Sequence, residues 1–215
     1  MGDLTIMDHA IPRLEMDELR EDLAQYLGPR VKRLGYLGEL FKCAGNAPDV
    51  ILTFMHFTDA LKEALPERLT ELGALTVAGY MENRYERHQH ERLSEKLGFP
   101  REWIADVIRL EPESATTLSD LEKAAQTYAL KALRTRGLDV EKEFARLAEK
   151  LPASEAMAFV MLIGRYVTHA MVVNTLGLKP PVQSIFEGVD HGRTHLDFRK
   201  ERGRADEPAR GDRGP

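Results

Sequence analysis

Residues 66–98 read PERLTELGALTVAGYMENRYERHQHERLSEKLG, and the interpretation of the whole sequence starts from this stretch. It begins as an apolar helical segment and ends in a dense polar one. Residues four apart share a helix face, so Glu82, Glu86 and His90 are predicted to form one stripe, with His88 pointing away. A carboxylate one turn before an imidazole orients the ring and raises its pKa. Facing a cavity, such a pair is an acid/base unit; facing water, it is a weak surface salt bridge.

Most of the chain shows apolar residues at helical spacing, and no window alternates as a strand does. We therefore expect an all-α fold, a helical bundle between an irregular N-terminus and an extended C-terminal tail. Gly28-Pro29 is expected to end the first helix, and Ser119 with Glu122 to form a capping box. The expected helices span residues 14–27, 31–43, 48–64, 66 to a break between Gly79 and Asn83, 84–97, 101–110, 118–134, 140–150 and 155–176.

The chain is expected to form one helical domain with two tails. The predicted boundaries are 1–13 for the N-terminal tail, 14–180 for the domain and 181–215 for the C-terminal tail. The last fifteen residues, ERGRADEPARGDRGP, have almost no apolar anchor and are expected to be disordered. The preceding residues contain aromatic and aliphatic anchors that suit contact with a neighbouring surface.

Composition excludes several classes of protein. A net charge of −5 argues against general nucleic-acid binding, which needs a basic face. No apolar run of membrane-spanning length and no secretory signal are apparent, so we expect neither membrane insertion nor export. The single cysteine, Cys43, excludes an intrachain disulfide and is interpreted as a small buried hydrophobe in a reducing, cytoplasmic setting.

LPERLTELGALTVAGYMENRYERHQHERLSEKLGFPREWI resembles the carboxymuconolactone decarboxylase family, which includes the AhpD-type alkylhydroperoxidases. Members without redox cysteines often read Tyr-Glu-Trp-x-x-His at the site, and the matching residues here run from Tyr85 to His90. The upstream glutamate of the family falls on Glu71. The resemblance covers roughly residues 30–180 and implies an AhpD-like helical fold that assembles as a homo-oligomer, in the family usually a trimer or hexamer.

The sequence also departs from the family pattern. The two redox cysteines of the peroxidase branch would fall on Asn83 and Glu86, neither of which forms a thiolate, so the disulfide relay is absent. The tryptophan of the cysteine-less variant is replaced by Arg87. This cation suits either an anionic substrate or solvent.

For the decarboxylase branch, the resemblance implies proton transfer without a cofactor on a small carboxylated molecule. His90 is the expected proton donor, because an imidazole titrates near neutral pH, and Glu86 would polarise it. The expected catalytic residues are Glu86, His90 and Glu71; the expected substrate-binding residues are Tyr85, Arg84, Arg87 and Asn83.

Other interpretations of the same residues stay open. A metal bound by Glu82, Glu86 and His90 is disfavoured, because Arg87 stands where a di-iron motif would have its glutamate. A catalytically silent ligand-binding or partner protein would also explain the missing cysteines. A thiol peroxidase would have to depend on Cys43. His169 and His56 are interpreted as core or interface residues.

Overall fold

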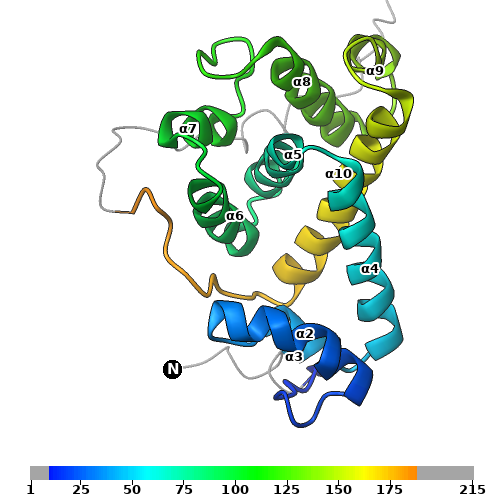
Figure 1. The fold of residues 1–215 in the computed structure, drawn as a ribbon. Coiled ribbons are helices and arrows are strands. Elements are labelled where there is room, and N and C mark those ends of the chain that lie inside the picture. The colour runs from blue at the N-terminus through cyan, green and yellow to red at the C-terminus, as the bar shows by residue number, and fades with distance from the viewer. Residues whose placement is uncertain (1–9, 188–215) are drawn as a thin grey trace, which may run out of the picture. The chain divides into compact units, whose positions relative to one another are not determined.

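The computed structural model of this 215-residue protein describes residues 10–187, and residues up to Ile185 belong to one compact unit. The described chain contains no strand, so the all-α prediction is confirmed (Figure 1). The predicted disorder of the last residues lies outside the described part. The helices are α2 (Glu21–Leu34), α3 (Glu39–Ala44), α4 (Pro48–Ala64), α5 (Glu67–Tyr80), α6 (Arg84–Lys96), α7 (Arg101–Arg109), α8 (Asp120–Thr135), α9 (Glu141–Ala148) and α10 (Ala153–Thr175).

Helix α5 is the centre of the bundle. Every residue from Leu69 to Ala78 is buried, because α6, α7, α8 and α10 pack around it (Figure 1). Gly73 lets α10 approach closely: a Cβ atom there would lie 2.8 Å from Leu162 Cδ2 and 3.3 Å from the Phe159 ring. Larger residues at this position would push the two helices apart.

The predicted bounds of the first two helices are wrong. Residues 11–20 form no helix, α2 continues through Pro29, and α3 begins only at Glu39. The proline ring normally clashes with the Cβ of the preceding residue, but that residue is Gly28, which has no Cβ. The true end is Gly35, with φ of 81° and its N–H bonded to Val31 O at 2.7 Å.

The break between α5 and α6 occurs where it is predicted. Glu82 has a left-handed φ of 54°, and Asn83 caps α6 by accepting a hydrogen bond from the Glu86 N–H at 3.1 Å. The predicted stripe of Glu82, Glu86 and His90 is therefore wrong in one member, because Glu82 precedes the helix and is exposed. The predicted capping box of Ser119 and Glu122 on α8 is confirmed.

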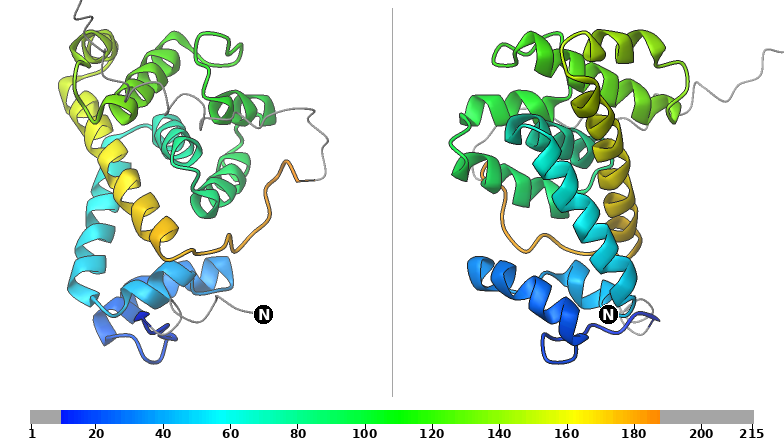
Figure 2. Two further views of the ribbon diagram at one scale, coloured as in Figure 1. Left: turned by 180° about the vertical axis from the view of Figure 1, so that it is seen from behind. Right: turned by 45° about the vertical axis from the view of Figure 1, so that its right-hand side comes forward.

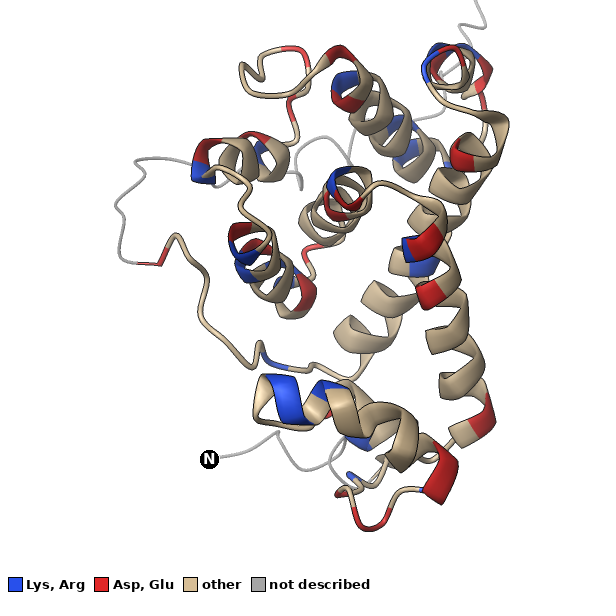
Figure 3. Ribbon diagram, in the orientation of Figure 1, with Lys and Arg blue, Asp and Glu red and all other residues tan. Residues whose placement is uncertain are grey.

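Helix α10 lies against α4 and α5 on one side and is exposed on the other (Figure 2). It is long and apolar enough to cross a membrane by length and composition, so the prediction that no apolar run reaches this length is wrong. Buried core helices pass the same test, and the most apolar window of α10 is 56% buried. Few charged positions lie along it (Figure 3). Six exposed residues between the two ends of the helix are here called the α10 stripe: Met157, Met161, Gly164, Thr168, Met171 and Val172.

The chain after α10 returns to α6 and contacts its outer face (Figure 1). Val182 O lies 3.1 Å from His88 Nδ1, and Arg92 Nε donates to Gln183 O at 2.8 Å. The Ile185 N–H donates to the buried carboxylate of Glu91 at 3.2 Å. Residues 182–185 therefore fix α6 from the side opposite to Glu86 and His90.

Candidate functional site

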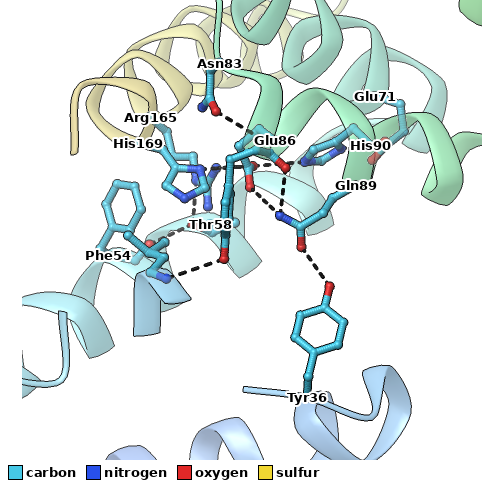
Figure 4. Close-up of polar contacts among 12 residues, drawn as sticks. Tyr36, Phe54, Thr58, Glu71, Asn83, Glu86, Gln89, His90, Arg165 and His169 are labelled. Atoms are coloured by element: carbon cyan, nitrogen blue, oxygen red, sulfur yellow. Dashed lines mark hydrogen bonds and ion pairs between the residues drawn. The ribbon is translucent and has the colours of Figure 1, made fainter. Parts of the chain in front are cut away.

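Four helices bring the candidate site together. Glu71 comes from α5, and Glu86 and His90 come from α6, one turn apart (Figure 4). Helix α10 supplies Arg165 and His169. Helix α4 adds Thr58 and Phe54 beside Arg165, so a compact polar cluster lies inside an otherwise apolar core.

Both ring nitrogens of His90 face carboxylates. Nδ1 lies 2.7 Å from Glu71 Oε2, and Nε2 lies 3.3 Å from Glu86 Oε2. Ser94 also donates to Glu71 Oε2 at 3.3 Å, and the edge of the His90 ring meets the Tyr166 ring at 5.3 Å. His90 and Glu71 are 7% and 2% exposed, so these are buried interactions rather than a surface salt bridge.

Glu86 is shared by two imidazoles and a guanidinium. Its Oε2 lies 3.0 Å from His169 Nδ1 and 3.8 Å from Arg165 Nη1, in addition to the contact with His90. Its Oε1 accepts a hydrogen bond from Gln89 Nε2 at 3.4 Å. The predicted pair is therefore part of a larger network, with the contact order Glu71, His90, Glu86, His169.

The sequence analysis did not place Arg165 or His169 in the site. Arg165 is 6% exposed; its Nε donates to Thr58 Oγ1 at 2.9 Å, and its guanidinium lies over the Phe54 and Tyr166 rings at 4.8 and 4.3 Å. A charged residue in the middle of an apolar helix was the available signal, because a buried cation needs a partner.

The two imidazoles have opposite pKa shifts. Burial disfavours a protonated His90, but Glu71 and Glu86 outweigh burial and raise its pKa to about 9. Burial lowers the pKa of His169, and Arg165 and His90 add to this against the opposing effect of Glu86. Burial also disfavours ionised Glu86, yet His169 and His90 hold its pKa well below the usual range. These shifts favour the protonated form of His90 and the neutral form of His169.

The expected substrate-binding residues occupy different environments. Asn83 is buried as the cap of α6, and the hydroxyl of buried Tyr85 accepts the Leu40 N–H at 3.4 Å. Burial raises the pKa of Tyr85. Arg84 is exposed, and Arg87 pairs with Glu91 at 3.2 Å. The cation closest to the acid/base cluster is thus Arg165.

An apolar pocket of about 330 Å³ lies beside the end of α10. Neither Glu86 nor His90 is among its lining residues, which are Ile11, Cys43, Ala44, Met171, Val172, Thr175 and Leu176. Cys43 and Leu176 also belong to a buried cluster with Tyr85, and the Tyr85 ring meets the His169 ring edge-on at 6.4 Å. Tyr85 therefore packs against both the wall of this pocket and the acid/base cluster.

The remaining candidates are as follows. Cys43 is buried, as the sequence indicates, and His56 is exposed with its ring against Tyr26. Within residues 10–187, no group of three or more His, Cys, Asp or Glu side chains is arranged to hold a metal.

Comparison with known proteins gives structural neighbours only: no family profile and no curated protein matches the sequence. An AhpD-core structure, an uncharacterized peroxidase-related protein from Ralstonia eutropha JMP134, superposes with a TM-score of 0.67 at 20% identity, covering 79% of this chain and 90% of that one. The chain has the AhpD-like fold. This result confirms the fold that the sequence resemblance implies.

Two further neighbours share the AhpD-like fold. The debrominase Bmp8 has a TM-score of 0.69 at 15% identity, covering 83% of this chain and 94% of that one. A putative antioxidant defence protein AhpD from Agrobacterium tumefaciens has a TM-score of 0.58 at 17% identity, covering 65% of this chain and 96% of that one. The neighbours thus include an enzyme and peroxidase-related proteins.

Proposed function

We propose that this protein is a cofactor-independent acid/base enzyme, a decarboxylase-like lyase or an isomerase, that acts on a small carboxylated organic molecule. Glu86 and His90 form the proton shuttle, with Glu71 in support. The observation that carries the proposal is the buried His90 ring between two carboxylates, 2.7 and 3.3 Å away. Burying charged groups away from water costs free energy, so such a cluster is a poor way to stabilise a fold. Titratable groups with shifted pKa values are typical of sites that transfer protons.

The chemistry fits the charges in the site. Loss of CO₂ leaves an electron pair on carbon, delocalised as an enolate-like anion that must be stabilised and protonated. His90, with a pKa raised to about 9, holds a proton at neutral pH, and Arg165 is a fixed cation near the same carboxylate. An isomerisation would move a proton between two carbons with the same groups. Neither reaction requires an oxidant.

The substrate carboxylate needs a cation. The sequence favours Arg84 or Arg87 for this role, and that assignment stays a prediction. The geometry favours Arg165, because Arg84 is exposed and Arg87 is paired with Glu91, whereas Arg165 is buried 3.8 Å from Glu86. A structure of Bmp8 in complex with 2,3,4-tribromopyrrole supports a small-molecule role for a protein of this fold.

The test is a turnover screen in D₂O. Small lactone acids and unsaturated carboxylic acids are incubated with the protein, and NMR records loss of CO₂, double-bond migration and deuterium entering at carbon. We expect His90→Gln to lose at least about 100-fold in rate, since general acid–base groups contribute that much. Cys43→Ser is the matched control and should keep full activity.

Two results would point to the alternatives. No turnover, but specific thermal stabilisation by one carboxylic acid, would identify a silent binding protein. Consumption of an organic hydroperoxide that disappears in Cys43→Ser would identify a thiol peroxidase, although Cys43 is buried and the positions implied for redox cysteines hold Asn83 and Glu86.

We also propose that the protein is a homo-oligomer that buries the α10 stripe. From Met157 to Met171 its positions are separated alternately by four and three residues, the spacing of helices that pack together in pairs. The stripe has no charged side chain, and Met157 and Met171 are 56% and 60% exposed. An uncharged, self-complementary face suits a second copy of the same helix.

A further inference from the structure

The acid/base cluster has two ends, and His90 is at neither of them. The order of contacts is Glu71, His90, Glu86, His169, with separations of 2.7, 3.3 and 3.0 Å (Figure 4). Both nitrogens of His90 face carboxylates. A proton therefore cannot pass directly from His90 to a substrate while Glu86 stays in place. It passes first to Glu86, or the Glu86 side chain has to move away.

His169 is the terminal imidazole. Its Nδ1 lies 3.0 Å from Glu86 Oε2 without hydrogen-bond geometry, and its Nε2 likewise has no hydrogen-bond partner among the described residues, although the side chain is 3% exposed. The ring packs against Phe54 and Tyr85, with both centroid distances 6.4 Å. Buried polar atoms almost always have a partner. Among the three unpartnered nitrogens of the cluster, Arg165 Nη1 and His169 Nδ1 lie 3.8 and 3.0 Å from Glu86 Oε2, so Nε2 is the one best suited to a ligand.

We propose that His169 Nε2 is the atom that exchanges a proton with the substrate, and that Glu86 and His90 act through it. This proposal rests on the proposed function and adds a catalytic residue to it. Glu86 Oε2, 3.0 Å from Nδ1, favours the tautomer with its hydrogen on Nδ1, and the lone pair of Nε2 is then free to act as a base. A carboxylate that fixes the tautomer of a histidine base is the arrangement of hydrolytic triads.

The step balances without a further reactant. His169 Nε2 takes a proton from a carbon next to the substrate carbonyl, the C–H electron pair enters the enolate, and the imidazolium is stabilised by Glu86. The same proton then returns to another carbon, and the enolate electron pair forms the new C–H bond. The reaction that this step describes is the isomerisation of a small carbon acid.

The surroundings keep His169 neutral between turnovers. The groups that face it are Glu86 and His90 from α6, Arg165 from its own helix, and the hydroxyl-bearing ring of Tyr85. Arg165 and protonated His90 already provide two cations for Glu86, so a third is disfavoured. The His169 imidazolium is consequently more acidic than an ordinary imidazolium, which helps it to return its proton.

The first test needs no substrate. Nitrogen-15 NMR of the full chain reports the tautomer of each histidine, with assignment by His169→Asn and His90→Gln. We expect His169 to be neutral at pH 7 with hydrogen on Nδ1. A hydrogen on Nε2 instead, or a doubly protonated ring, would overturn the proposal whether or not a substrate has been found.

The second test uses a substrate from the turnover screen. His169→Asn keeps an amide N–H near the position of Nδ1 but has no group at Nε2, so turnover should fall at least about 100-fold while the raised pKa of His90 persists. His56→Asn, at an exposed histidine, is the control that should not change the rate. Full activity in His169→Asn with loss in His90→Gln would reject His169 as the base and leave the proposed function standing.

Discussion

At the scale of single residues, Glu86 links the two halves of the cluster, because it contacts His90, His169 and Arg165. Its position is one that the family resemblance assigns to a redox cysteine in the peroxidase branch, and here it carries a carboxylate 3.0 Å from one imidazole and 3.3 Å from another. A thiolate there would exchange electrons, whereas a carboxylate exchanges only protons. Both positions that the resemblance assigns to redox cysteines, Asn83 and Glu86, therefore lack a thiol in this chain.

The raised pKa of His90 predicts a pH dependence of stability. An unfolded histidine titrates near 6.5 and the folded one near 9, so the folded state binds the proton more tightly. The resulting stabilisation is complete below pH 6.5 and is lost as pH rises through 9. Urea unfolding should show a loss of up to roughly 3 kcal/mol across this interval. His90→Gln should lack that loss, and parallel pH profiles for the two proteins would contradict the assignment.

At the scale of elements, the start of α6 aligns the site. Asn83 ends the left-handed turn at Glu82 and binds the Glu86 N–H at 3.1 Å, which sets the rotation of the helix that carries Glu86 and His90. Because Asn83 is 1% exposed, water cannot readily replace this hydrogen bond.

Asn83→Ala should therefore destabilise the protein by about 1–2 kcal/mol in urea unfolding, the cost of losing a buried helix cap. Asn83→Ser is the matched variant, because its hydroxyl also accepts from the first turn, and it should keep most of the stability. Equal losses in both variants would show that the amide matters for packing rather than for capping.

The helices differ in how well the sequence predicts them. The break at Asn83, the capping box on α8 and the closeness of Glu86 to His90 follow from local signals, and the structure contains all three. The course of α2 through Gly28-Pro29 was missed because the glycine relieves the usual clash.

The partners from α10 were missed for a different reason. Arg165 and His169 lie about eighty residues from Glu86, and their contact depends on how α10 is rotated against α5 and α6. That rotation is fixed by packing such as Gly73 against Leu162, which periodicity does not report. Local pattern therefore identified Glu86 and His90, the family resemblance supplied Glu71, and only tertiary packing reveals Arg165 and His169.

At the scale of the whole molecule, α10 has two different faces. The inner face carries Arg165 and His169 into the site, and the outer face is the uncharged α10 stripe. In the proposed oligomer both faces are buried, so assembly would hold the catalytic side chains of α10 in place.

Met161→Glu should dissociate the oligomer, because a carboxylate in the middle of an apolar contact cannot be buried unpaired. Sedimentation velocity at several concentrations measures the change. Leu138→Glu is the control, since Leu138 is 62% exposed and lies outside α10. A wild-type protein that sediments as a monomer throughout would rule out this interface.

The return of residues 182–185 to α6 has a mechanical consequence. Helix α6 is contacted on two opposite sides. The inward side chains of α10 contact one side, and the backbone of residues 182–185, which follow α10, contacts the other. Contacts on two opposite sides restrict the rotation of α6 about its own axis. Cutting the chain near Pro180-Pro181 would remove the second set of contacts. Helix α6 could then rotate and move Glu86 away from its partners, although no atom of the cluster itself would be changed.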